Sequence, residues 1–577
     1  MIKKSILIVF IHFGYFATAQ IPSTEVGVDI KIFPKENMQL SINSNLLLAG
    51  ELLQYKAHNL NIANRKSTLS KVVYVSMRNE NDSVVFSHKL KLENGTANGD
   101  FFIPSSLKTG VYRFIGYTNF SRNNSQDAFV EKSIYVINSF VKSEKITGKQ
   151  IDTVFVKMAT IPNSQQSLNS QLNNFLIATD KSSYGFREKV VVNMENTAGN
   201  IPGNYVLSVR KINPVEILDN PLNEFNNKSS EIFYIPELRG EIISGVVFSK
   251  TDNQPVANKE VSLTIPGKDY IFKIAKTNSN GRFFFSVPEG YNAEKSIVQL
   301  NETPVNATDF NLVLSQKNLN LGESDASFLK LDPEMKEWLQ ERSVQMQIEN
   351  AYYDAKKDSI LKNEANVPFY SNLGAVFLLD DYTRFSTVKE TFVEVVTLAA
   401  IRGSGSDSRF VVNNEYDPNG TAKFNDIPPL VLLDGMQILN NEDLINYNSR
   451  EIESIRVINK SYRYGPKIFS GIIAVETKKG DFVPAKNDGY IEEINLSPAV
   501  KNKEYFRPNY SQKSVNARIP DYRVQLLWQP DFDFSKETIS TTFYTSDVAG
   551  VFEILLEGYS EDGKYIIIKN HFIVAEN

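Results

Sequence analysis

Short strand-like runs separated by turn residues recur along the chain, and this pattern leaves few folds open. Between residues 28 and 138, runs rich in β-branched and aromatic side chains occur at 71–79, 83–92 and 109–120. The stretch 94–100 is rich in Gly and Asn, so a turn is expected there. Strands of this length and spacing are typical of an antiparallel sandwich. The sequence therefore predicts a mainly β fold.

The first twenty residues have the pattern of a secretory signal peptide. Lys3 and Lys4 precede a largely apolar run at 6–16, and small residues follow at 17–19. No later run offers about 18 uninterrupted apolar residues, so no transmembrane span is expected after processing. We expect an exported protein that is periplasmic or associated with the outer membrane of a Gram-negative cell.

Composition excludes several classes of function. The chain has no cysteine, which rules out disulfides, a thiolate nucleophile, cysteine-bound metals and a lipid anchor on cysteine. The formal net charge of −5 shows no basic excess, so nucleic acid is not expected as a partner. A length of 577 residues predicts several domains, at about 100–200 residues each.

Two N-terminal segments repeat one theme. The first contains strand-like stretches at 47–61 and 99–120, and in the second Asp180 and Tyr184 precede a strand at 189–194. Both segments resemble the second macroglobulin-type domain of exported bacterial proteins. The resemblance implies two β-sandwiches in tandem.

The next segment resembles the carboxypeptidase regulatory-like domain. The resemblance rests on a strand at 243–247 and on the pattern Thr277, Gly281, Phe283. Asn280 before Gly281 favours a tight turn with positive φ, so a hairpin is expected at this point. The resemblance implies a small accessory β-sandwich and no peptidase activity.

A helix is predicted after Asp332. Asp332, Pro333 and Glu334 provide an N-cap, a proline at the first helical position and an acid in the first turn. Apolar residues then recur on one side, interrupted by two charged residues: Met335, Leu339, Met346 and Tyr353, with Arg342 and Glu349 between them. This pattern predicts a core helix that joins neighbouring domains.

The C-terminal third carries the most specific resemblance. The blocks PPLVLLDG at 428–435, IESIRV at 452–457 and GIIAVETKKG at 471–480 occur in one order. In that order they resemble the plug domain of TonB-dependent receptors of the starch-utilisation type, in an exported protein of the Bacteroidota. A flexible loop is expected at 402–410. The strands predicted after residue 482 resemble an immunoglobulin-like end domain, and they are too few for a barrel of about 22 strands.

The chain shows no linear pattern for catalysis, cofactor binding or metal binding, so no catalytic, cofactor or metal residue is predicted. The mature histidines are isolated from one another and from any nucleophile: His58, His88 and His571. Two carboxylate pairs could bind calcium between domains or act in glycoside hydrolysis, although solvated turns are their commoner setting: Asp380 with Asp381, and Asp531 with Asp533. Trp338 and Trp528 fall at predicted core positions, which gives sugar stacking no support.

Together these patterns predict tandem immunoglobulin- and macroglobulin-like β-sandwiches with a small α/β plug-like domain. The expected boundaries are a signal peptide (1–20), two macroglobulin-like sandwiches (21–162 and 175–237) with a polar linker at 163–174, a carboxypeptidase regulatory-like sandwich (238–316), a helical connector (331–366), a plug-like domain (367–484) and an immunoglobulin-like end domain (485–577).

Three functions fit this organisation. The first is a non-enzymatic scaffold or binding protein that works with an outer-membrane barrel protein or its accessory proteins. The second is a periplasmic or surface protein that binds a glycan or peptide. The third is an enzyme whose site is assembled between domains, which would require convergent carboxyl groups of raised pKa in one pocket.

Overall fold

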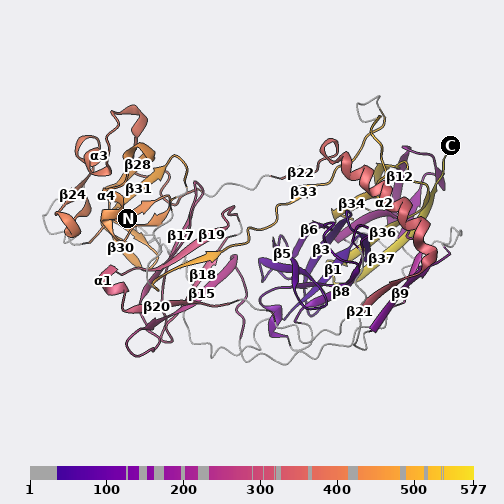
Figure 1. The fold of residues 1–577 in the computed structure, drawn as a ribbon, viewed down its shortest axis with the longest axis horizontal. Helices are drawn as coiled ribbons and strands as arrows, with labels where there is room; N and C mark the ends of the chain where they lie inside the picture. Colours follow the sequence, from indigo (N-terminus) through magenta and orange to yellow (C-terminus); the bar gives the residue numbers. More distant parts are fainter. Residues whose placement is uncertain are drawn as a thin grey trace, which may run out of the picture.

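The computed structural model shows a mainly β protein with two lobes (Figure 1), as the strand pattern predicts. It describes residues 35–124, 128–141, 152–160, 175–196, 202–218, 233–288, 290–302, 304–316, 319, 327–361, 367–413, 427–480, 482, 489–511, 518–534, 536 and 538–576. The predicted signal peptide and the linker at 163–174 lie outside these residues. Within them, no helix is both long enough and apolar enough to cross a membrane.

The first sandwich packs a three-stranded sheet, ordered β1-β3-β6, on a five-stranded sheet, ordered β2-β8-β7-β4-β5. Its strands are β1 (Glu36–Ile42), β2 (Leu46–Leu48), β3 (Leu52–Asn61), β4 (Val72–Arg78), β5 (Val84–Lys91), β6 (Thr96–Phe102), β7 (Gly110–Tyr117) and β8 (Val130–Ile137). The prediction of a turn at 94–100 was largely wrong. Only Asn94 and Gly95 turn the chain with positive φ, and β6 then pairs with β3. The hydrogen bonds of this ladder outweigh the weak strand propensity of Asn and Gly.

The second sandwich is built from two segments far apart in the sequence. Its sheets have the orders β10-β12-β35 and β11-β37-β36-β13-β34. The strands are β10 (Phe175–Thr179), β11 (Ser183–Tyr184), β12 (Lys189–Asn196), β13 (Gly203–Lys211), β34 (Gln525–Phe532), β35 (Thr538–Tyr544), β36 (Gly550–Ser560) and β37 (Tyr565–Val574). The segments expected as separate domains, 175–237 and 485–577, therefore share one hydrophobic core. Strand β13 pairs with β34 and β36 on its two edges, because a buried strand must satisfy both rows of backbone groups.

A small sheet and a long helix complete this lobe. The sheet has the order β14-β9-β21, from β9 (Asp152–Met158), β14 (Val215–Leu218) and β21 (Ser327–Leu331), and it packs on β2 and β8. It thus joins strands expected in different domains. Helix α2 (Lys336–Ala351) follows a short 3-10 turn, whose N-cap Asp332 accepts a hydrogen bond from the Glu334 backbone amide as predicted.

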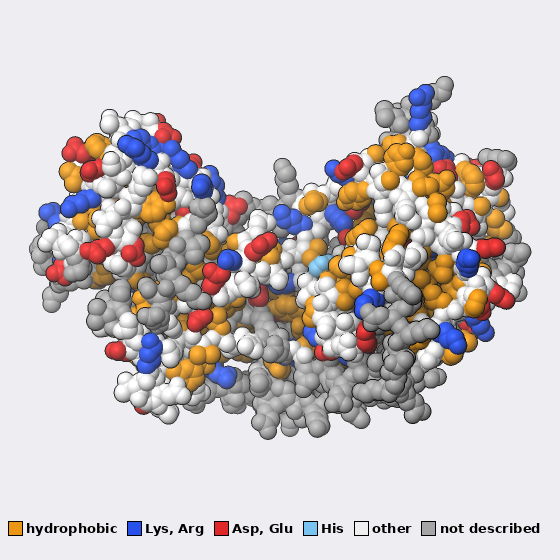
Figure 2. Space-filling model, viewed as in Figure 1, with side chains coloured by type: hydrophobic (Ala, Val, Ile, Leu, Met, Phe, Trp, Pro, Cys, Tyr) orange, Lys and Arg blue, Asp and Glu red, His pale blue; other side chains and the backbone are white. Residues whose placement is uncertain are grey.

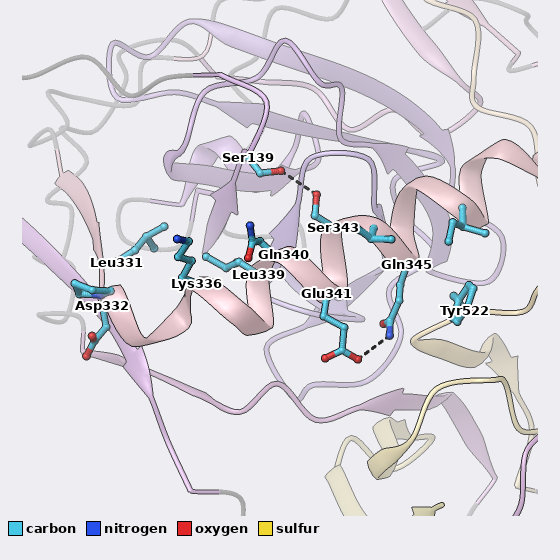
Figure 3. Close-up of a pocket in the computed structure, with 13 residues that line it drawn as sticks. Ser139, Leu331, Asp332, Lys336, Leu339, Gln340, Glu341, Ser343, Gln345 and Tyr522 are labelled. Carbon is cyan, nitrogen blue, oxygen red and sulfur yellow. Dashed lines mark hydrogen bonds between the residues drawn. The ribbon is translucent and has the colours of Figure 1, made fainter. Parts of the chain in front are cut away.

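Helix α2 lies against the first sandwich and close to the second. Figure 3 shows Ser343 of α2 hydrogen-bonded to Ser139 of the first sandwich, with Tyr522 beside the C-terminal half of the helix. On the second side, the Glu349 carboxylate accepts a hydrogen bond from the Tyr522 backbone amide at 2.9 Å. The helix therefore connects both sandwiches.

The third sandwich forms the base of the left lobe in Figure 1. Its sheets have the orders β18-β15-β20 and β17-β16-β19-β32. The elements are β15 (Glu241–Ser249), β16 (Glu260–Ile265), β17 (Ile271–Lys276), β18 (Arg282–Val287), β19 (Lys295–Leu300), α1 (Pro304–Ala307), β20 (Phe310–Leu314) and β32 (Ile491–Asn495). Strand β32 comes from the segment expected in the C-terminal domain. The expected hairpin at Gly281 was also wrong. The turn has positive φ, but it passes the chain between sheets, so β17 and β18 do not pair.

A compact unit of strands and short helices, residues 367–482, lies above the third sandwich in Figure 1; we call it the βα unit. Its main sheet has the order β23-β28-β31-β26-β27. The elements are β23 (Ala375–Leu378), α3 (Val388–Glu394), β24 (Ala399–Arg402), β25 (Arg409–Val412), β26 (Leu430–Leu433), β27 (Met436–Gln437), α4 (Asn441–Ile445), β28 (Ile452–Ile458), β29 (Tyr462–Tyr464), β30 (Lys467–Phe469) and β31 (Ile472–Thr477). Strands β24 and β25 pair across the expected 402–410 loop, and β29 pairs with β30.

The chain passes between the lobes four times: after β14, after β20, after β22 (Ser359–Ile360) and after β32. Strand β22 pairs with β33 (Lys503–Glu504), and this ribbon lies between the lobes in Figure 1. The Lys503 ammonium binds Asp100 of the first sandwich at 2.8 Å and Asp358 at 3.1 Å. A second connection pairs buried Lys89 with Glu241 of the third sandwich at 2.6 Å. The predicted helical connector is thus one of several links between the lobes.

Candidate interaction site

The two motifs that gave the βα unit its resemblance contact each other. Asp434 follows β26 with φ of 50°, and its side chain is buried. Its carboxylate accepts hydrogen bonds from the Thr477 backbone amide at 2.7 Å and from the Thr477 hydroxyl at 2.6 Å. The Phe482 amide donates a third bond at 3.1 Å. One buried carboxylate therefore joins the ends of β26 and β31.

One face of the main sheet is covered by the unit's own helices. Helix α3 begins at a capping box, in which Thr387 and Glu390 bond each other's backbone amides. Apolar residues of α3 and α4 pack on this face with those of β28 and β31, among them Phe392 and Leu444. The helices thus give the unit a core of its own.

The opposite face packs on the third sandwich. Leu430, Leu432 and Ala474 of this face join Phe272 of β17, and Tyr270 directly before that strand, in one buried cluster. The approach is close at Gly435, where a Cβ atom would lie 2.2 Å from the Tyr270 ring. Only glycine fits this position, which also has φ of 80°. The βα unit is therefore fixed to the third sandwich by apolar packing.

This apolar face continues past the covered part of the sheet to the edge strand β23. Val376 is opposite Arg456 of β28, and Arg456 is opposite Ala474 of β31, so their side chains lie on the same face as the buried cluster. At β23 this face is uncovered: Val376 is 42% exposed and Leu378 is 50% exposed. Among the described residues, β23 pairs only with β28. An open strand edge with exposed apolar side chains is a template for pairing with another strand.

The surface of the left lobe carries both apolar and charged side chains. The molecule is hollowed between the two lobes, and hydrophobic side chains on the left lobe are interspersed with charged ones (Figure 2). Near β23, Tyr382 is 45% exposed, and the Asp380 carboxylate is bonded to the Arg384 guanidinium. The edge therefore carries both apolar and charged groups.

The three histidines of the mature chain lie in different surroundings. His58 is buried between the first two sandwiches beside Tyr559, where burial and the nearby Lys56 and Lys66 charges lower its pKa well below the usual value. The His88 ring bonds the Tyr55 hydroxyl at 2.7 Å inside the first sandwich. His571 lies on β37, 3.5 Å from Glu553. None of these contacts forms a nucleophile–base pair.

The carboxylate pairs have structural partners. Asp531 binds Lys56 at 2.9 Å and accepts a bond from Asn98 at 3.0 Å, so it joins the second sandwich to the first. Asp380 pairs with Arg384 within one turn. In the described part of the chain, no three His, Asp or Glu side chains are grouped as metal ligands. Trp528 is buried and Trp338 packs at the edge of a core, as predicted.

A buried charge cluster at the seam between the first two sandwiches was not predicted from the sequence. Arg342 of α2 donates two bonds of 2.8 Å to the Glu51 carboxylate. The Arg210 guanidinium of β13 lies 3.4 Å from the same carboxylate. The one signal was the position of Arg342 and Glu349 on the predicted apolar side of the helix, where a charge requires a buried partner.

No protein-family model and no curated protein matches this chain. Solved structures with related folds include trypsin-activated alpha-2-macroglobulin from Escherichia coli, which is 9% identical with a TM-score of 0.24 over 94% of this chain and 42% of its own. The native conformation of the E. coli protein is 10% identical with a TM-score of 0.24, over 97% of this chain and 40% of its own. The Yersinia pseudotuberculosis adhesin InvE is 12% identical with a TM-score of 0.12, over 49% of this chain and 59% of its own. The chain spans about two fifths of the length of these macroglobulins, and similarity at this level carries no functional argument.

Proposed function

We propose that this protein is a non-enzymatic, exported scaffold that binds an outer-membrane barrel protein, or an accessory protein of such a barrel, through the open edge of β23. The observation that carries the proposal is the edge of β23, which no other described strand pairs with and where Val376 and Leu378 are exposed. The resemblance of the βα unit to a receptor plug supplies the class of partner. The right lobe would extend the protein away from the docking edge.

Strand addition suits this edge for two reasons. An added strand would satisfy the free row of backbone groups on β23, and its side chains would cover Val376 and Leu378. Val376 and Leu378 are already about half buried, so covering the rest of each contributes about 0.7–1.5 kcal/mol. The packing of the βα unit on the third sandwich would hold the edge in a fixed orientation.

The test is affinity capture of the mature protein from detergent-solubilised membranes of its own cells. The wild type should recover an outer-membrane β-barrel protein, identified by mass spectrometry. The double variant Val376→Lys/Leu378→Lys should recover at least about tenfold less, because charged side chains on an edge strand oppose pairing. A matched control is Val393→Lys on α3 of the same unit, which changes a side chain that is 74% exposed and distant from β23 in sequence. Equal recovery by the double variant would refute docking through β23.

Binding of a peptide or glycan is a second candidate function, and one observation favours it. A cavity lies where the first two sandwiches meet α2, lined by aromatic and charged side chains. The third candidate, an enzyme with a site between domains, would need matched carboxyl groups in that cavity. There burial raises the pKa of Glu349, whereas burial of Glu51 is outweighed by the Arg342 and Arg210 charges, which lower its pKa. Both carboxylates are already bonded to cationic side chains.

A further inference from the structure

The cavity at the seam of the right lobe is built by at least five parts of the chain. The turn before β3 contributes Glu51, helix α2 contributes Arg342, β13 contributes Arg210 and β34 contributes Trp528, while the segment after β33 closes one side with Tyr505. Its volume is about 240 Å³, just below the range of about 300–1,000 Å³ for ligand pockets, so it suits a small group. Because these parts come from two sandwiches and a helix, the cavity exists only when the lobe is assembled.

Two buried N–H donors of residues that line the cavity have no acceptor among the residues that the structure describes. They are Nε of Arg210 and Nε1 of Trp528, in side chains of residues that are 9% and 3% exposed. Nearly all buried polar groups in proteins are hydrogen-bonded, so two unsatisfied donors in one lining need an explanation. Both nitrogen atoms are covered by protein atoms, so the acceptor oxygens of a ligand would satisfy them after small shifts of the lining side chains.

The charges of the lining also favour an anion. The single carboxylate of Glu51 forms ion pairs with two guanidinium groups, those of Arg342 and Arg210. Burial lowers the pKa of Arg210 to about 10, against the attraction of Glu51, so its guanidinium stays charged at neutral pH. Arg507 lies among the lining residues, and within the described chain its guanidinium has the amide oxygen of Gln529 at 3.4 Å and no carboxylate within ion-pair distance. The other cations are paired: Arg523 with Asp521, and Lys356 with Glu349.

Aromatic side chains provide the remaining walls. Trp528, Tyr505, Phe506, Tyr522 and Phe102 all line the cavity. Aromatic walls bind apolar or aromatic groups, and a few convergent donors fix the ligand's orientation. Guanidinium groups are suited to carboxylates, which they can bind through two parallel hydrogen bonds.

We propose that this cavity binds a carboxylate attached to an apolar or aromatic group, with the Arg210 and Trp528 donors bonded to its oxygens. Such a group occurs in a small organic acid and at the C-terminus of a peptide. The site lies in the right lobe and β23 in the left, so the test of this proposal and the test of docking through β23 are independent.

The test uses the full mature protein and N-acetyl-L-phenylalanine as the probe, with N-acetyl-L-phenylalanine amide as its uncharged counterpart. The chain has two tryptophans; Trp338 does not line the cavity, so Trp338→Phe leaves Trp528 as the reporter. Titration of this variant with the acid should change Trp528 fluorescence saturably, and the amide should bind at least about tenfold more weakly. No saturable change with the acid, or equal binding of acid and amide, would overturn the proposal.

A second variant separates the ligand role from a structural one. Trp528→Phe keeps an aromatic ring but removes the unsatisfied N–H, so it should weaken binding of the acid about tenfold in calorimetric titration. The smaller ring also loses buried packing, so the melting temperature should fall, and binding is compared at a temperature where both variants are folded. Trp338→Phe is the matched control and should bind as the wild type does. Equal affinity of the two variants would contradict the assignment of Nε1.

The two sources of the carboxylate are distinguished with a tripeptide, Gly-Gly-Phe, and its C-terminal amide. Tighter binding of the free-acid tripeptide than of N-acetyl-L-phenylalanine would identify a peptide C-terminus as the ligand. Tighter binding of the single amino acid would identify a small organic acid. Either result supports the proposed chemistry, whereas binding of the tripeptide amide as tightly as the free acid would refute it.

Discussion

The two lobes differ in the interactions that hold their parts together: mainly apolar packing in the left lobe and charged groups in the right. In the left lobe the βα unit meets the third sandwich through apolar side chains, with Tyr270 and Phe272 against Leu430 and Ala474. In the right lobe the two sandwiches meet through the buried charges of the Glu51 cluster and through buried Lys56, whose partner Asp531 is 61% exposed. Apolar burial is non-directional, whereas a buried ion is tolerated only where its partners are in place. The left seam therefore requires only that apolar surfaces fit together. The right seam requires each charged group to be in a set position, and such a seam can also bind a charged ligand.

The largest loss of stability is expected when one buried charge is removed from the right seam. Arg342→Met leaves the Glu51 carboxylate buried with Arg210 alone, so the free energy of unfolding should fall by about 3–5 kcal/mol. Urea unfolding followed by tryptophan fluorescence measures the change, since Trp338 and Trp528 both lie in the right lobe. Glu341→Ala, at the exposed neighbouring position, should cost less than about 0.5 kcal/mol. A loss below about 1 kcal/mol for Arg342→Met would show that the seam does not depend on its charges.

The left seam should be sensitive to shape. Gly435→Ala places a methyl group 2.2 Å from the Tyr270 ring at a residue with φ of 80°. Overpacking and left-handed strain together should cost about 3 kcal/mol, read from calorimetric unfolding. Gly405→Ala is the matched control, because φ there is also positive, at 56°, but no atom lies within 4 Å of the added Cβ. The control should cost about 1 kcal/mol. Equal costs would show that the approach to Tyr270 is not tight.

The right seam should weaken in acid. Burial, with the charges of Lys56 and Lys66, lowers the pKa of His58, so the folded protein holds this ring neutral. Below about pH 6.5 His58 binds a proton in the unfolded chain but not in the folded one. The free energy of unfolding therefore falls as the pH falls, by up to about 1.4 kcal/mol per pH unit. His58→Phe should therefore flatten the stability profile between about pH 5 and 6.5. An unchanged dependence of stability on pH in this variant would show that groups other than His58 cause the acid sensitivity.

The smallest effect is expected at the rim of the left seam. The Lys268 ammonium lies 3.2 Å from Glu453, but both side chains are largely exposed, at 65% and 48%. Exposed pairs contribute little because water and salt screen them, so Lys268→Ala should change the free energy of unfolding by less than about 0.5 kcal/mol. A larger loss, measured by urea unfolding, would mean that the rim as well as the apolar centre holds the βα unit.

Local features of the fold were predictable from the sequence. The strand at 452–458 and the helix cap at Asp332 follow from periodicity and capping rules, which act over a few residues. The blocks that end at Gly435 and Gly480 also predicted a compact unit, and Asp434 shows why they occur together, since it bonds Thr477.

Long-range pairing was not predictable. Period-two patterns show which face of β35 or β36 is buried, but not which distant strand lies beside it. The pairing of β12 with β35 and of β13 with β36 therefore overturned two expected domain boundaries. The cavity at the right seam was missed for the same reason, because Arg210, Arg342 and Trp528 come from three separate segments.

Site-specific photo-crosslinking tests the central claim, docking through β23, most directly. A photoreactive amino acid at position 376 in living cells should form a covalent adduct with an outer-membrane β-barrel protein or its accessory protein, and the same residue at position 393 should not. Both positions lie in the βα unit and are exposed, so the comparison depends on the edge alone. Adducts with the same partner at equal yield from both positions, or an adduct from 393 only, would contradict docking through β23.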